Sequence, residues 1–100
     1  KIPRFDPSEG RRIRILFSGK VQKVGFRQEV HEMAQRLNLT GWVKNRSDLS
    51  VEAEVQGEAL RIDFLIAHMK SLKRAAVREV TMADLPVVRG EEGFIILRPR

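Results

Sequence analysis

Apolar residues follow two different periods in the first part of the chain. Over residues 11–18 they recur at every second position, as Ile13, Ile15 and Phe17, which is the pattern of a strand with one buried face. A helix face is indicated from residue 26 to about residue 38 by the apolar positions Phe26, Val30, Met33, Ala34 and Leu37. The pattern therefore predicts a strand, a loop containing Gly19 and Gly25, and a helix.

After this helix the same two patterns recur. A polar turn over 47–50 separates two runs with strand periodicity, and Val51, Ala53 and Val55 of the second run are expected to face the core. Helical spacing then returns, with Ile62, Leu65, Ile66 and Met69 on one face. The predicted elements are strands over 41–46, 50–56, 76–82 and 94–97 and a helix over about 58–72.

The order of these elements predicts an α+β fold. Strand, helix, strand, strand, helix, strand is the split βαβ or ferredoxin-like sandwich, here with a short additional C-terminal strand. In this fold two helices cover one face of a mainly antiparallel sheet. Residues 1–10 contain Pro3, Pro7 and Gly10 without periodicity and predict a flexible N-terminal leader, so residues 11–100 are expected to form a single domain.

Composition narrows the possible chemistry only in part. The chain has 100 residues, of which 42% are apolar and 32% charged, as expected for one globular domain. It has no cysteine, which excludes disulfides, thiolate nucleophiles and cysteine-bound metals. It also has no apolar run long enough to span a bilayer. The net charge of +6 favours anionic partners, although the positive residues are scattered as on an ordinary solvated surface.

The junction between the first strand and the first helix is a candidate anion site. Glycines permit a tight turn that presents backbone N–H groups, and the start of a helix carries partial positive charge. Arg27 adds a permanent charge with donors suited to phosphate or carboxylate oxygens. The alternative is that Gly19 and Gly25 only form a tight loop and that Arg27 is solvated. The spacing by itself favours the anion site slightly.

Side chains that usually carry catalysis are sparse. His31 and His68 lie in predicted helices without a second ligand at metal-binding spacing, so no metal site is predicted. Ser18, Ser47 and Ser50 have no neighbouring base that would mark a nucleophile. An enzyme with this sequence would therefore use chemistry in which water attacks an already activated substrate.

Nucleic-acid binding on the open face of the sheet is a weaker alternative. That mode of binding uses exposed aromatic residues on the central strands, and Trp42 is the one aromatic residue placed to stack. Glu52 and Glu54, on the outward face of their strand, would repel phosphate. The loop also lacks the Gly-Lys-Ser/Thr ending of a nucleotide-binding P-loop.

Two motifs resemble those of the acylphosphatase family. The first is G-K-V-Q-K-V-G-F-R over 19–27, where the family form is G-x-V-Q-G-V-G-F-R, and the second is G-W-V-K-N over 41–45, where it is G-W-V-x-N. The likeness extends over roughly residues 11–98. It departs from the family at Lys23, where glycine is common, and at Asp48-Leu49, where Asp-Gly is usual.

The resemblance implies a cytoplasmic, monomeric hydrolase that needs neither metal nor cofactor. Such an enzyme cleaves the carboxyl–phosphate bond of a small acyl phosphate, by direct attack of a positioned water, to give a carboxylate and inorganic phosphate. It implies that Arg27 binds the phosphoryl group and that Asn45 positions the water. The phosphate would lie in a cradle of backbone amides from Gln22, Lys23, Val24, Gly25 and Phe26. No membrane partner is implied.

Two alternatives stay open at this stage. One is a non-catalytic module of the same fold that binds phosphate or nucleic acid, and the other is a domain of a larger maturation protein. The identity of the acyl phosphate does not follow from the motifs.

Overall fold

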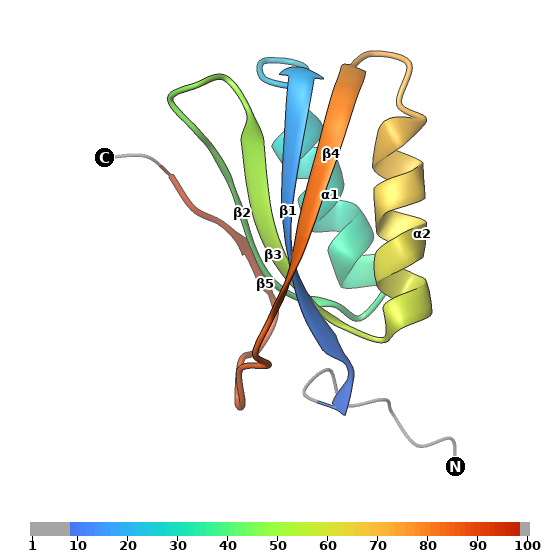
Figure 1. Cartoon of the computed structure of the whole chain (residues 1–100), viewed down its shortest axis with the longest axis vertical. Coiled ribbons are helices and arrows are strands. Elements are labelled where there is room, and N and C mark those ends of the chain that lie inside the picture. Colours follow the sequence, from blue (N-terminus) through green and yellow to red (C-terminus); the bar gives the residue numbers. More distant parts are fainter. Residues whose placement is uncertain (1–8, 99–100) are drawn as a thin grey trace.

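The computed structural model describes residues 9–98. The order of elements confirms the predicted series of strands and helices (Figure 1). The strands are β1 (Arg11–Lys20), β2 (Thr40–Asn45), β3 (Val51–Gly57), β4 (Ala76–Leu85) and β5 (Phe94–Ile96), and the helices are α1 (Phe26–Arg36) and α2 (Ala59–Lys70).

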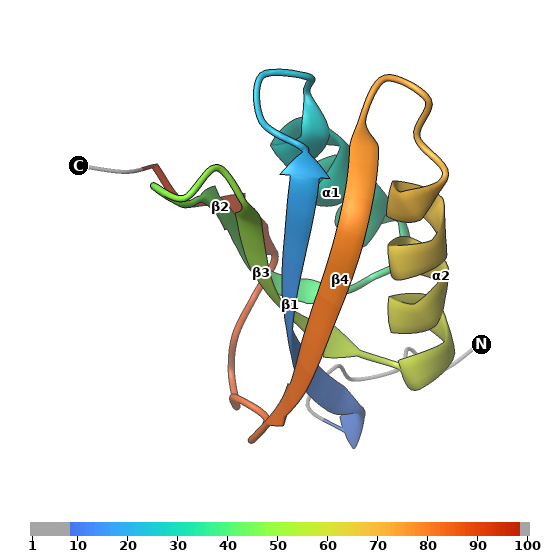
Figure 2. The same ribbon diagram turned by 45° about the horizontal axis from the view of Figure 1, so that its top comes forward.

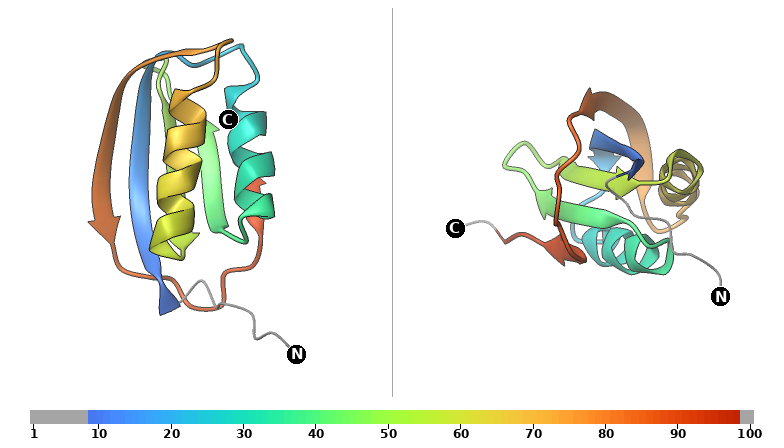
Figure 3. Two further views of the ribbon diagram at one scale, coloured as in Figure 1. Left: turned by 90° about the vertical axis from the view of Figure 1, so that its right-hand side faces the viewer. Right: turned by 90° about the horizontal axis from the view of Figure 1, so that it is seen from below.

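The strands within the described residues form one sheet in the order β4-β1-β3-β2-β5. Neighbouring strands are antiparallel except for β2 and β5, which are parallel. Helices α1 and α2 lie together on one face of this sheet, and the other face is open (Figure 3). The predicted ferredoxin-like α+β sandwich is therefore confirmed.

The core lies between the helices and the sheet, where the alternating residues of β1 meet those of β3. Ile15 pairs with Ala53 and Phe17 with Val51, so the apolar faces of the two central strands coincide. Phe17 also packs edge-on against Phe26, the first residue of α1, with ring centroids 5.1 Å apart. Because Phe26 is anchored in this way, the start of α1 and the loop before it are tied to the centre of the sheet.

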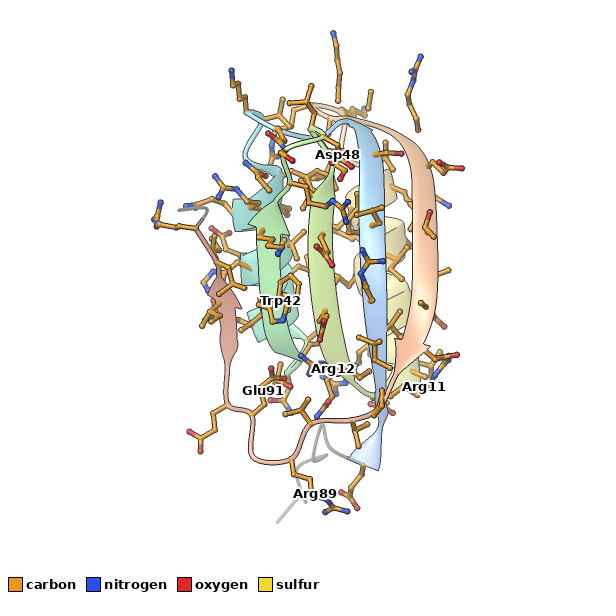
Figure 4. The ribbon with its side chains drawn as sticks, turned by 60° about the vertical axis from the view of Figure 1, so that its left-hand side comes forward. Arg11, Arg12, Trp42, Asp48, Arg89 and Glu91 are labelled. Carbon is orange, nitrogen blue, oxygen red and sulfur yellow. The ribbon has the colours of Figure 1, made fainter. Side chains whose placement is uncertain are left out.

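The open face of the sheet carries an ionic network that the sequence pattern did not reveal. Arg12 is only 4% exposed there, and its guanidinium bonds the carboxylates of Glu54 and Glu91. Gln56 accepts a hydrogen bond from the backbone N–H of Val88 and donates one to its carbonyl. These contacts hold the segment between β4 and β5 against the lower end of the open face (Figure 4).

Element boundaries differ from the predicted ones in two places that matter. Strand β4 continues to Leu85 rather than ending at residue 82, because its last residues complete the ladder with β1. Helix α1 ends at Arg36 rather than near residue 38, and Asn38 just beyond it has a left-handed φ of 55°, a common way for a helix to end. Of the predicted leader, residues 1–8 lie outside the described residues, and the leader stays a prediction. Neither α1 nor α2 is long and apolar enough to cross a lipid bilayer, and the described residues contain no other helix that is.

Candidate active site

A small hollow of about 80 Å³ lies at the end of the sheet where the β1–α1 loop meets the end of β2. It brings together Arg27 and Asn45, which lie on different elements. Its lining residues come from the loop, from the first turn of α1 and from the last residue of β2. The ribbon shows the loop and the β2–β3 turn toward the same end of the sheet (Figure 2). The described residues that line it are Val21, Lys23, Gly25, Phe26, Arg27, Gln28 and Asn45.

The loop backbone alternates in handedness along this wall. Lys23 and Gly25 have left-handed φ angles of 65° and 74°, and Val24 between them does not. This alternation makes successive N–H groups converge, as in the anion-binding turns called nests. No backbone N–H of residues 22–26 donates a hydrogen bond to another described residue. The loop therefore presents several unpaired donors, and it can accept an anion.

The side chain of Gln22 has a structural task that the motif did not reveal. Its Nε2 donates to the carbonyl oxygens of Arg46 and Ser50, each at 2.9 Å. Both carbonyls belong to the turn between β2 and β3, so Gln22 fastens the loop to the element that carries Asn45. The turn is itself held by Asp48, whose pKa is lowered by hydrogen bonds from the Ser50 hydroxyl and backbone N–H.

The two predicted catalytic side chains have polar groups that are not engaged. Arg27 forms no hydrogen bond or ion pair with a described residue, whereas Arg46 near the same end of the sheet pairs with Asp48 and Glu52. The Oδ1 atom of Asn45 is buried and has no hydrogen-bond partner among residues 9–98. Of the described residues that line the hollow, Lys23 and Arg27 are cationic and none is acidic. The hollow is therefore suited to a small anion that also offers a hydrogen bond to Asn45.

The histidines do not take part in this hollow. His31 lies with its ring 6.3 Å from that of Phe94, and His68 bonds the carboxylate of Glu29 at 2.7 Å. Glu29 also accepts from Arg74, and these hydrogen bonds, first from His68 and then from Arg74, lower the pKa of its carboxyl group. Within residues 9–98 no group of three or more histidine and carboxylate side chains could hold a metal ion.

Two residues beside the predicted set belong to the same region. Gln28 lines the hollow and directly follows the motif, so its position in the first turn of α1 could have indicated it. Arg74, in the segment between α2 and β4, bonds the loop carbonyl of Val24. No pattern in the sequence indicated that Arg74 belongs to this region, because Arg74 and the loop are far apart in the chain and become neighbours only when it folds.

The fold and the hollow define the class of this protein as an α+β sandwich whose loop before the first helix has backbone N–H groups without acceptors among the described residues. The acylphosphatase family model matches residues 13–96. An acylphosphatase of Rubrobacter xylanophilus is 39% identical over 85 residues, which cover 84% of this chain and 77% of that protein. The crystal structure of acylphosphatase from Bacillus subtilis superposes with a TM-score of 0.80 at 31% identity, covering 86% of this chain and 97% of that one.

The chain belongs to the acylphosphatase family, which confirms the family and the enzyme class predicted from the two motifs. A structure of full-length HypF is also similar, with a TM-score of 0.75 and 27% identity. That match covers 97% of this chain but 12% of the HypF chain. The same fold thus also occurs within a much longer protein.

Both departures from the family motifs coincide with left-handed residues. Lys23 has φ 65° and Leu49 has φ 73°, at the two positions where glycine is usual. A side chain in this conformation costs roughly 1–2 kcal/mol relative to the right-handed region. The left-handed backbone therefore explains why glycine is usual at these two positions. In this chain Lys23 and Leu49 carry the corresponding backbone strain.

We expect Lys23→Gly to be more stable than Lys23→Ala by about 1 kcal/mol, because only glycine removes the steric cost of the left-handed angle. Urea unfolding of the purified variants measures this difference. Leu49→Gly compared with Leu49→Ala is the matched pair outside the hollow and should show a similar gain. Equal stability of the glycine and alanine variants at both positions would contradict the explanation.

We expect Glu29→Gln to unfold more easily at neutral pH by roughly 1 kcal/mol. Since the pKa of Glu29 is lowered in the folded state, its ionised form stabilises the fold above the unfolded pKa, and this contribution is lost as the pH falls through the folded pKa. The deficit of the variant should therefore begin to shrink as the pH falls below the unfolded pKa of glutamate, about 4.3, and should vanish below the lowered folded pKa. Unfolding in urea across this range tests it, with the exposed Glu32→Gln as the control. A deficit that is the same at every pH would be the contrary result.

Proposed function

We propose that this chain hydrolyses acyl phosphates by direct attack of water. In this proposal Arg27 and the backbone amides of residues 22–26 bind the phosphoryl group, and Asn45 positions the water. The observation that supports it is the meeting, in one hollow, of a guanidinium, backbone N–H groups and a buried amide oxygen, none of which has a partner among the described residues.

The phosphoryl group would lie against the loop with its oxygens toward the N–H donors. Donors fixed in advance stabilise the charge that spreads over these oxygens in the transition state, without reorganising during the reaction. Arg27 contributes two donors in one plane and a charge that no described carboxylate neutralises. Lys23 at the edge of the hollow adds a second positive charge.

Asn45 would hold the attacking water through Oδ1. A buried carbonyl oxygen without a hydrogen-bond donor is unfavourable, and a water O–H would satisfy it. The oxygen of this water forms a bond to phosphorus while the bond from phosphorus to the acyl oxygen breaks. The carboxylate leaves, and the water proton passes to phosphate oxygen or solvent. Because a carboxylate is a good leaving group, positioning and charge stabilisation are sufficient.

Arg27→Ala is expected to lower kcat/KM for acetyl phosphate by about a hundredfold or more, because it removes both charge and donors from the phosphoryl site. Arg27→Lys should also be poor, since an ammonium group cannot donate in the planar bidentate manner. Steady-state hydrolysis measures both variants, with Arg36→Ala, an exposed change on the same helix, as the control. A folded Arg27→Ala variant with nearly full activity would refute the proposal.

Wild-type protein that binds inorganic phosphate through Arg27 without turnover would instead favour the non-catalytic alternative. Salt-sensitive binding of RNA would favour the nucleic-acid form of that alternative. A cytoplasmic location and a monomeric state, which the family resemblance implies, stay predictions of the same proposal.

Asn45→Ala should lower kcat by roughly tenfold to a hundredfold while inhibition by inorganic phosphate changes little. The reason is that its amide is expected to contact the water and not the phosphoryl oxygens, so that mainly transition-state stabilisation is lost. Kinetics with acetyl phosphate, and inhibition by phosphate, separate the two effects. A loss of phosphate affinity as large as that of Arg27→Ala would instead place Asn45 in the phosphoryl site.

A further inference from the structure

We propose that Arg74 is a positioning residue for this reaction, which orients the peptide between Val24 and Gly25 so that the Gly25 N–H faces the phosphoryl site. The inference rests on the proposed function of the loop. It adds a side chain that lies outside both motifs and does not line the hollow.

Arg74 reaches the loop from the segment between α2 and β4. Its Nε donates to the carbonyl oxygen of Val24 at 2.8 Å. The guanidinium also lies close over Gly25, because a Cβ atom built on that glycine would be 3.7 Å from Nε. Figures 1 and 2 show the two segments side by side at the same end of the sheet. Arg74 therefore contacts the loop backbone directly, through this hydrogen bond.

The hydrogen bond from Arg74 determines the direction of one N–H of the loop, that of Gly25. In a planar trans peptide the C=O and the following N–H lie in opposite directions. Because the carbonyl of Val24 is directed toward Arg74, the N–H of Gly25 is directed away from Arg74. That N–H has no acceptor among the described residues, and Gly25 lines the hollow. Arg74 thus keeps one donor available to an anion.

Without the hydrogen bond from Arg74, the plane of the peptide between Val24 and Gly25 is free to rotate. Glycine tolerates both signs of φ, so Gly25 offers little resistance to such a rotation. A rotated peptide would direct the carbonyl oxygen of Val24 at the phosphoryl oxygens, where like partial charges repel. One stabilising donor would be replaced by one repelling acceptor.

Arg74 is itself held in place by Glu29, which His68 in turn contacts. Its Nη2 donates to Oε1 of Glu29 at 3.0 Å, and Oε2 of Glu29 is 2.7 Å from Nε2 of His68. Glu29 lies in the first turn of α1 and His68 in the last turn of α2. The charge of Arg74 is therefore paired with a carboxylate, so we assign its effect to orientation rather than to general attraction of anions.

The test replaces Arg74 by Met, which keeps an unbranched chain without donors, and by Lys, which retains a donor. We expect Arg74→Met to lower kcat for acetyl phosphate by about tenfold, less than the loss of a direct oxyanion donor, and Arg74→Lys to restore part of it. Lys73→Met makes the same change of charge at the neighbouring exposed residue and should stay within about twofold of wild type.

A second measurement follows the Gly25 amide directly. In wild type its ¹H–¹⁵N resonance should shift on titration with inorganic phosphate, and in Arg74→Met this shift should be largely lost while other loop amides still respond. A purely structural role would lower stability without this selective loss. Unchanged kcat together with an unchanged Gly25 response in Arg74→Met would overturn the inference.

The same measurements separate this inference from the proposed function. If wild type binds phosphate but hydrolyses no acyl phosphate, the proposed reaction fails. An Arg74-dependent Gly25 shift would then still support the positioning role, and its absence would overturn that role too.

Discussion

The register of β3 is the constraint on which the rest of the site depends. Val51, the first residue of β3, pairs with Phe17 of β1 on one side and with Asn45 of β2 on the other. The end of β1, from which the loop departs, is thereby brought level with the end of β2. A shift of one residue in either ladder would turn the apolar faces away from the core, so burial of those faces keeps the register. The hollow exists because two antiparallel pairings end at the same place.

Around this frame, the loop is fastened from two sides by side chains that bond backbone carbonyls. Gln22 donates to the β2–β3 turn, and Arg74 donates to Val24 from the segment between α2 and β4. In the loop held by these two contacts, no backbone N–H of residues 22–26 has an acceptor among the described residues. An unsatisfied, left-handed loop is unfavourable by itself, and it persists because the surrounding fold determines it. Strain at Lys23 is part of the same arrangement.

Charge pairing distinguishes Arg27 from Arg46 and Arg74, which bond other parts of the same end of the sheet. The net charge of +6 is spread along the sequence, but in the folded chain Arg12, Arg14, Arg46 and Arg74 are all engaged by carboxylates. Within the described residues Arg27 has no such partner and faces a hollow without acids. A guanidinium that is not neutralised attracts an anion more strongly than a paired one at the same position. In the proposed function the anion is therefore bound by the unpaired Arg27, and the overall charge says little about it.

Much of this protein follows from the order of its residues alone. The period-two run of Ile13, Ile15 and Phe17, the helical spacing after Phe26 and the two motifs determine the element order, the fold class and the family, because each depends on local patterns that the chain carries within itself. Element ends, such as the extension of β4 to Leu85, depend on pairing with a distant strand and could not be read in this way.

Only the tertiary structure decided which polar groups are free and which are engaged. Glu54 and Gln56 appear in the sequence as outward-facing polar residues, yet they bond a buried Arg12 and hold the segment before β5. Gln22 and Arg74 likewise donate hydrogen bonds to backbone carbonyls that are far away from them in the chain. The residues of the loop, Arg27 among them, are therefore set by sequence. The orientation of the loop backbone is set by hydrogen bonds between segments that become neighbours only when the chain folds, because such bonds depend on distances that local pattern does not encode.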